Sequence, residues 1–308
     1  MVSPRIMAVL ALIHGFDAFR AIVLGALQGF SELFPISSLG HTVLFPKLFG
    51  WNQLVAYQSS SSENAWLAFI VMLHVGSALG LLIYFWRDWV AIVKAFFATL
   101  GKRRVETSNE RMAWLIIAAS IPTGILGLIF EHTARVATGK PEVAAIFLVV
   151  NGVVLFVAQR LMRRSEVRAI ARREGSKDDG GRVLETLEYR EAALLGLEQS
   201  AGLIAGISRD GMVMAGGLAR GLDNSDAARM SFLMATPIIL AAGLFKLPDL
   251  LGHNGDGIRG YAALACLVAA VVAVFTVHFL TRYFKRGNLI PFAAYCVIFG
   301  AAMIAYTA

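Results

Sequence analysis

Cysteine and charge are both scarce in this chain. Of its 308 residues, two are cysteine and only 16% are Asp, Glu, Lys or Arg. Cys266 and Cys296 fall inside apolar runs, which excludes a disulfide framework and a thiolate metal site. Apolar residues make up 57% of the chain and the mean hydropathy is +0.65, well outside the range of soluble globular domains. The sequence therefore predicts an integral membrane protein.

The excess of basic residues does not indicate binding to nucleic acid. The net charge is +7, but Lys and Arg gather in the segments between apolar runs, a pattern that membrane topology produces by itself. The first 17 residues hold a short apolar run and no convincing small-residue cleavage site. We therefore expect no removed signal peptide.

Several apolar runs are long enough to cross a bilayer, which takes about 20 residues. The predicted spans are Trp66–Phe85, Met112–Phe130, Val143–Gln159, Met230–Leu247, Tyr261–Leu280 and Leu289–Tyr306. Val90–Leu100 is predicted to be a shorter interfacial or half-buried helix, and Gln53–Asn64 and Leu161–Arg190 are polar connections, the second a charged cytoplasmic loop. Residues 1–308 are thus expected to form one all-α membrane domain.

Two further pairs of short apolar segments each flank a polar centre. The first pair is Phe16–Phe34 and Ile36–Trp51, interrupted at Pro35. Proline removes a backbone donor and disfavours helical geometry in the residue before it. The second pair is Glu191–Ile207 and Gly211–Leu222. Because each piece is short for a full crossing, both pairs are predicted to be re-entrant helical hairpins.

The two hairpins share an internal repeat. Identical residues recur at one constant offset: Gly25, Gln28, Ile36, Ser37 and Gly40 match Gly196, Gln199, Ile207, Ser208 and Gly211. Lys and Arg are abundant in 87–111, 160–190 and 282–286 and sparse in the intervening loops, so the rich segments are predicted to be cytoplasmic. The copies, about 16–130 and 190–308, then have opposite orientations. This is an inverted-topology repeat whose broken helices meet near the midplane.

The first polar centre carries chemically active groups. Gln28 and Glu32 share one face of a helix because they are four residues apart. Ser37 and Ser38 stand where the next helix begins, and His41 follows. Polar groups at membrane depth persist mainly where they line a cavity or pair with one another. A helix start binds anions, so this stretch is predicted to be a reaction centre.

The second hairpin contributes Ser208–Arg209–Asp210–Gly211. An arginine is the natural partner of a phosphate or diphosphate because its guanidinium donates two parallel hydrogen bonds. Asp210 is expected to pair with Arg209. His74 and His278 stand alone within spans and are expected to pack or to form hydrogen bonds, not to act as ligands.

The residues Gln-Gly-x-x-Glu-x-x-Pro-Ile-Ser-Ser-x-Gly-His from Gln28, with Gly-x-Ser-Arg-x-Gly from Gly206, resemble the undecaprenyl-diphosphatase family associated with bacitracin resistance. The resemblance covers nearly the whole chain. It implies a multi-pass protein of the inner (plasma) membrane that hydrolyses a polyprenyl diphosphate to the monophosphate on the outer face, recycling the lipid carrier of cell-wall synthesis. It also implies a divalent cation, Mg or Ca.

Roles follow by position from the resemblance. The expected catalytic residues are Glu32, Ser38, His41 and Arg209, the substrate contacts are Ser37, Ser208, Arg209, Asp210 and Gly211, and the metal site is Glu32 and Gln28. The chain departs from the family pattern at Leu39, Ala205 and Asp210, where a small or hydroxyl residue, proline and serine are usual. It is therefore identified as a divergent member.

Alternatives remain within this reading. Ser38 activated by His41 attacks the terminal phosphorus, or His41 activates water directly. Ser37 is expected to cap a helix. A transporter or flippase of a polyprenyl phosphate or another anion is the second functional class, but a dense cluster of nucleophile, base and cation favours catalysis. The expected partners are a polyprenyl diphosphate lipid and the membrane, with no nucleic acid, and a homodimer stays open.

Overall fold

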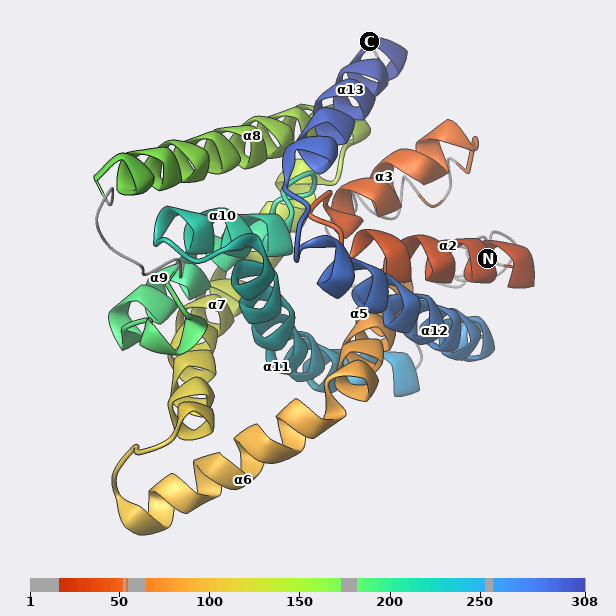
Figure 1. The fold of residues 1–308 in the computed structure, drawn as a ribbon. Helices are drawn as coiled ribbons and strands as arrows, with labels where there is room; N and C mark the ends of the chain where they lie inside the picture. Colours follow the sequence, from red (N-terminus) through yellow and green to blue (C-terminus); the bar gives the residue numbers. More distant parts are fainter. Residues whose placement is uncertain (1–16, 52–53, 55–64, 173–181, 253–256, 308) are drawn as a thin grey trace, which may run out of the picture.

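The computed structural model describes residues 17–51, 54, 65–172, 182–252 and 257–307, and these ranges are helical (Figure 1). The elements are α2 (Ala18–Ser31), α3 (Ser38–Leu48), α5 (Ala65–Tyr84), α6 (Trp86–Lys102), α7 (Ser108–Thr138), α8 (Pro141–Arg172), η1 (Leu184–Thr186), α9 (Tyr189–Gln199), η2 (Ser200–Leu203), α10 (Arg209–Ala219), α11 (Asn224–Leu251), α12 (Arg259–Tyr283) and α13 (Ile290–Thr307). Among the described residues, β pairing is limited to an isolated bridge between Arg182 and Leu222. The all-α prediction is confirmed.

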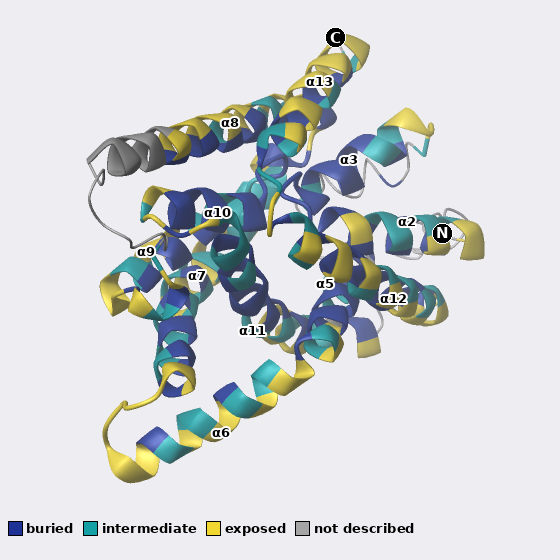
Figure 2. Cartoon of the chain, in the orientation of Figure 1, coloured by how far each residue is buried: buried dark blue, intermediate teal, exposed yellow. Residues whose placement is uncertain are grey.

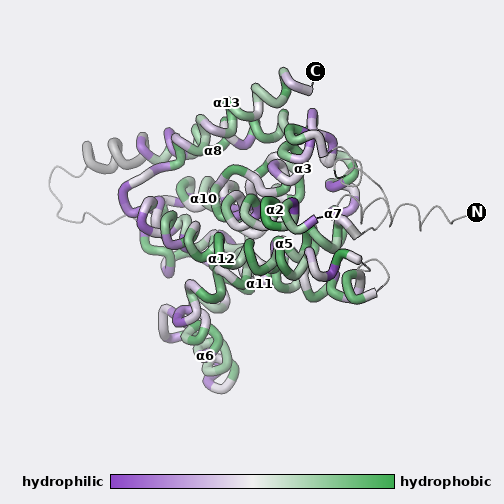
Figure 3. Tube along the Cα trace, turned by 90° about the vertical axis from the view of Figure 1, so that its right-hand side faces the viewer, coloured by the Kyte–Doolittle hydropathy of each residue, from purple (hydrophilic) through white to green (hydrophobic). Residues whose placement is uncertain are grey.

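Within the described ranges, six helices are long and apolar enough to cross a membrane: α5, α7, α8, α11, α12 and α13. They coincide with the six predicted spans. Their outward faces expose large apolar side chains such as Leu128, Phe275 and Ile298, and Figure 2 shows exposed residues along the outer sides of α8 and α13. Figure 3 shows that most of the bundle is hydrophobic. Such surfaces are stable against lipid and not against water.

Helix α8 is longer than the sequence reading allowed. Leu161–Arg190 was predicted to be a charged loop from its first residue, yet α8 continues to Arg172. No glycine or proline interrupts 161–172, and the residues there are mostly good helix formers, so the charged run extends the helix. Residues 173–181, the Ser-rich stretch 55–64 and the first 16 residues, on which other predictions fall, lie outside the described ranges.

The two predicted hairpins are pairs of short helices separated by a break. Helices α2 and α3 flank a turn that contains Pro35, while α9 and α10 are joined through η2 and the residues 204–208. Figure 1 shows the first pair on the right and the second on the left, with the breaks facing each other. Their depth in a membrane and their opposite orientation stay predictions.

Two glycines at matching positions of the predicted repeat have similar surroundings. Gly25 of α2 lies against the backbone carbonyl of Ala265 in α12, and Gly196 of α9 lies against that of Ala119 in α7. Neither place has room for a side chain. The same device therefore packs the first helix of each hairpin against a spanning helix, as expected if the repeat is a duplication.

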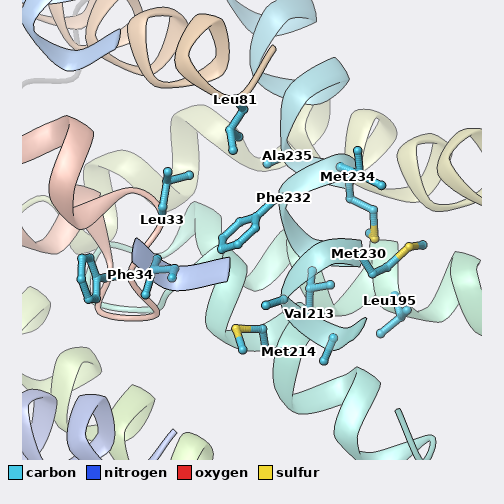
Figure 4. Close-up of a cluster of buried hydrophobic side chains, with 14 of the residues drawn as sticks. Leu33, Phe34, Leu81, Leu195, Val213, Met214, Met230, Phe232, Met234 and Ala235 are labelled. Carbon is cyan, nitrogen blue, oxygen red and sulfur yellow. The ribbon is translucent and has the colours of Figure 1, made fainter. Parts of the chain in front are cut away.

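Apolar side chains fill the space beside the breaks. Figure 4 shows Leu33 and Phe34 from the first break, Val213 from α10 and Phe232 from α11 in one cluster, and all four are buried. These residues come from both halves of the chain. The cluster therefore keeps water from approaching the breaks through this side of the bundle.

The close contact of α5 with α12 depends on glycine. A Cβ atom on Gly76 would meet the carbonyl oxygen of Cys266 and the side chain of Ala269, whereas Gly124 of α7 has nothing within 4 Å. Gly76→Ala should lower the unfolding temperature in detergent by several degrees, since overpacking costs about 1–3 kcal/mol. Gly124→Ala is the matched control and should be neutral or stabilising, because alanine is the better helix former. Equal unfolding temperatures for the two variants would contradict this account.

Candidate functional site

The two breaks are in direct contact. The Ser37 hydroxyl accepts hydrogen bonds from the backbone N–H of Gly40 at 3.2 Å and of Gly206 at 3.1 Å. The first bond caps α3, as predicted, and the second joins the hairpins. Ser37 itself has a φ of +69°, a left-handed conformation that a non-glycine residue holds only when its surroundings impose it. Ser37 is therefore a fixed structural joint between the halves.

A buried amide in α8 braces the same joint. Asn151 donates from Nδ2 to the Pro35 carbonyl at 2.9 Å, and its Oδ1 accepts from the Ser208 N–H at 2.9 Å. The Ser208 hydroxyl in turn accepts from the Gly211 N–H at 3.0 Å and caps α10. Sequence reasoning did not single out Asn151. Its signal was an amide inside an apolar span, which persists there only if it is satisfied.

Glu32 is the centre of the polar cluster. Its Oε1 accepts from Arg209 Nη2 at 2.9 Å. Its Oε2 accepts from Gln28 Nε2 at 2.9 Å and from the Ser38 hydroxyl, and His74 Nε2 lies 3.4 Å from the same oxygen. The Glu32 side chain is only 5% exposed, so these partners replace the water that a carboxylate needs.

Arg209 is shared between two acids. Its Nη2 also lies 3.2 Å from Asp210 Oδ1, as predicted, and its Nη1 donates to the Ala235 carbonyl at 3.3 Å. Asp210 is fully buried, and neither of its carboxylate oxygens has a hydrogen-bond partner among the described residues. One guanidinium thus faces two carboxylates. An arginine held in this way is fixed in place before any ligand arrives.

His41 lies apart from this cluster. Its Nδ1 is 2.7 Å from the Ser37 carbonyl and its Nε2 is 2.7 Å from the Tyr295 hydroxyl, and the ring stacks on Tyr295 and Phe299. Both nitrogens are therefore engaged away from Ser38, so this arrangement does not pair His41 with the serine as expected. The catalytic role of His41 stays a prediction. The tyrosine comes from α13, which sequence spacing did not connect to the motif.

A cavity of about 210 Å³ adjoins the cluster. Its polar lining includes Glu32, Ser38, His74 and Arg209, and apolar side chains such as Ile70 and Ile238 form most of its wall. The lining comes from the N-terminal half of α5 and from the C-terminal halves of α7 and α11. An apolar cavity with a few convergent polar groups is the usual form of a ligand site.

The predicted metal residues do not present a ready ion site. Gln28 turns its amide nitrogen to Glu32, and both oxygens of Glu32 already accept hydrogen bonds. Across the described residues, no group of three or more His, Cys, Asp or Glu is arranged to hold a metal ion. Mg²⁺ and Ca²⁺ require oxygen ligands. Both oxygens of Glu32 already accept hydrogen bonds, whereas Gln28 Oε1 has no hydrogen-bond partner among the described residues. The metal site at Glu32 and Gln28 stays a prediction.

Six spanning helices around a buried Ser-Glu-Arg cluster define a multi-pass membrane protein with a site suited to an anion. The sequence matches the family described as "Bacitracin resistance protein BacA" over residues 21–302. It is 45% identical to Undecaprenyl-diphosphatase 2 of Frankia alni and 45% identical to Undecaprenyl-diphosphatase of Mycolicibacterium paratuberculosis, each alignment covering 94% of this chain and 97% of the relative. Undecaprenyl-diphosphatase of Acidiphilium cryptum is 40% identical, with coverage of 91% and 95%. The chain belongs to the BacA family.

Replacing Asn151 should lower the stability of the protein by a measurable amount. Asn151→Leu leaves the Ser208 N–H buried without a partner, at about 1–3 kcal/mol, and leaves the Pro35 carbonyl with only a 3.9 Å contact from the Cys296 thiol. The variant should unfold several degrees lower in detergent. Asn224→Leu is the control, because that side-chain nitrogen has only a 3.8 Å contact with the Met162 sulfur. Equal unfolding temperatures for both variants would show that Asn151 does not brace the breaks.

Proposed function

We propose that this protein hydrolyses undecaprenyl diphosphate, or a closely similar polyprenyl diphosphate, to the monophosphate and inorganic phosphate. The observation that carries the proposal is the convergence of Ser38, Glu32 and Arg209 beside an apolar cavity. A serine hydroxyl, a carboxylate that accepts its proton and a guanidinium for phosphate are the groups that phosphoryl transfer needs. The reaction regenerates the lipid carrier for cell-wall synthesis, and the names of the relatives support the same activity.

The geometry supports Ser38 as the nucleophile. Its hydroxyl already donates to Glu32 Oε2, so Glu32 receives the proton as the serine oxygen bonds to the terminal phosphorus. The bond from that phosphorus to the bridging oxygen breaks, and the polyprenyl monophosphate leaves. Water then hydrolyses the phosphoserine. Direct attack by water is the alternative, with Glu32 accepting a proton of the water.

Substrate binding prepares the base. In the empty site the Arg209 guanidinium holds Glu32 Oε1 at 2.9 Å. A diphosphate carries more negative charge than the Glu32 carboxylate. It also offers two oxygens to the two parallel N–H donors of the guanidinium, so it draws Arg209 toward itself. Glu32 then loses its contact with Arg209 and becomes a stronger proton acceptor at the moment when Ser38 must be deprotonated.

A transporter is the less favoured reading. Alternating access requires the two halves to separate around the site. Here the breaks are joined by Ser37 and by Asn151 through direct hydrogen bonds, and Gly40 lies against the Gly206 backbone with no room for a side chain. A site closed in this way suits chemistry on a headgroup that enters from one side.

The proposal includes a divalent cation only as an ion that binds together with the substrate. Because both Glu32 oxygens are engaged in the empty site, we propose that Mg²⁺ or Ca²⁺ enters with the diphosphate, whose oxygens are good ligands for it. Chelator should then suppress turnover. It should leave the unfolding temperature of the lipid-free protein unchanged, since protein donors satisfy both Glu32 oxygens without an ion.

The direct test is phosphate release from undecaprenyl diphosphate by the purified protein, with and without chelator. Ser38→Ala should abolish release. Arg209→Lys keeps the charge but loses the fork, and losing one charge-assisted hydrogen bond should slow turnover by about ten- to a hundredfold. Arg229→Lys, which alters an exposed pair with Asp88, should behave as wild type. No release by the wild-type protein, or a normal rate for Ser38→Ala, would refute the proposal.

The active site is proposed to face the outside of the plasma membrane. The cavity is lined by the halves of α5, α7 and α11 that end at the Lys/Arg-poor loops, which the positive-inside rule places outside. A cysteine at the exposed Lys140 should react with an impermeant thiol reagent added to intact cells, and one at the exposed Gly101 should not. Wild type is the blank, because Cys266 and Cys296 are buried. If only the cysteine at position 101 were labelled, the orientation of the protein would be opposite to the one proposed.

A further inference from the structure

His74 lies where the site's chemistry takes place, although no motif pointed to it. It belongs to α5, lines the cavity together with Ser38 and Arg209, and is 18% exposed at its side chain. Its Nε2 is 3.4 Å from Glu32 Oε2, the same oxygen that accepts from the Ser38 hydroxyl. Histidine and serine thus meet on one carboxylate oxygen.

The orientation of the His74 ring is set by its own helix. Nδ1 lies 2.8 Å from the Ile70 carbonyl, which only accepts hydrogen bonds, so Nδ1 carries a hydrogen. This contact turns Nε2 toward Glu32. The ring is therefore placed to pair with Glu32 Oε2 in its imidazolium form, and it needs no rearrangement to do so.

The other histidine of the motif is not placed for this task. His41 is 1% exposed, does not line the cavity, and has both ring nitrogens within 2.7 Å of other partners. Its contact with the Ser37 carbonyl supports the strained joint between the breaks. His41 therefore supports the contact between the two breaks, whereas His74 faces the cavity and Glu32.

Glu32 needs a partner that stays when the substrate arrives. Arg209 is the partner of Oε1 in the empty site, but the proposed function draws its guanidinium to the diphosphate. The other charged side chains that line the cavity are Glu131 and Arg135 of α7, which pair with each other at 3.0 Å. His74 and Gln28 then remain as the side chains beyond Ser38 that contact Oε2.

We propose that His74 is a positioning residue that keeps Oε2 of Glu32 beside the Ser38 hydroxyl after Arg209 has turned to the substrate. The inference rests on the proposed phosphatase activity. It assigns His74 no bond to phosphorus and no proton of its own in the reaction. Its effect is on the fraction of bound complexes in which Glu32 points at the serine.

Kinetics of phosphate release test this role. His74→Leu should lower kcat by about tenfold, the effect of about 1.4 kcal/mol on the barrier, because Glu32 Oε2 loses the imidazole 3.4 Å away. KM should change little because the diphosphate still binds Arg209. His74→Gln should recover most of the lost rate, since its amide donates to the same oxygen. His278→Leu is the matched control: that histidine lies in α12 beside Tyr84, away from the cavity, and should leave kcat unchanged.

A double-mutant cycle separates this role from a general packing effect. If His74 acts through Glu32, adding His74→Leu to Glu32→Gln should cause no further loss of kcat. Additive losses, or a His74→Gln variant as slow as His74→Leu, would overturn the inference. The proposed function is judged separately, since the wild-type protein either releases phosphate or does not. A wild-type rate in His74→Leu would leave the function standing and remove His74 from it.

Discussion

The contact between Glu32 and Arg209 is the interaction on which the rest of the site depends. It joins a carboxylate from the first broken helix to a guanidinium from the second at 2.9 Å, and both side chains are largely buried. Removing Arg209 would leave Glu32 and Asp210 as two buried acids without the guanidinium between them, which is strongly destabilising. The pair is therefore a structural link between the halves of the chain, and it joins two groups that the proposed function uses.

Under the proposed function the same contact would also control activity. The carboxylate proposed to accept a proton is paired with the guanidinium proposed to bind phosphate, so a diphosphate would compete with Glu32 for Arg209. Asp210 shares that guanidinium at 3.2 Å and would keep a carboxylate beside Arg209 when the pairing changes.

The surrounding fold supplies rigidity where charge alone would not. Ser37 and Asn151 connect the two breaks through backbone groups, and Gly25 and Gly196 let the hairpins pack directly on α12 and α7. These contacts are made by small residues and buried amides. Such residues drive helix association in a membrane, where the hydrophobic effect does not favour contact with another helix over contact with lipid.

The sequence by itself determined the class of protein, the six spans and the identity of the polar motifs, because apolar runs and helix breakers are local signals that need no partner. It also paired Arg209 with Asp210, which are neighbours in the chain. The spacing of Gln28 and Glu32 placed these two on one helix face, but only the tertiary structure decided which distant groups meet Glu32. His74 stands in an unremarkable apolar run, and His41 sits in the motif yet faces Tyr295 of α13. Side-chain partners that are far apart in the chain are set by how helices pack, and no periodicity within one segment encodes that.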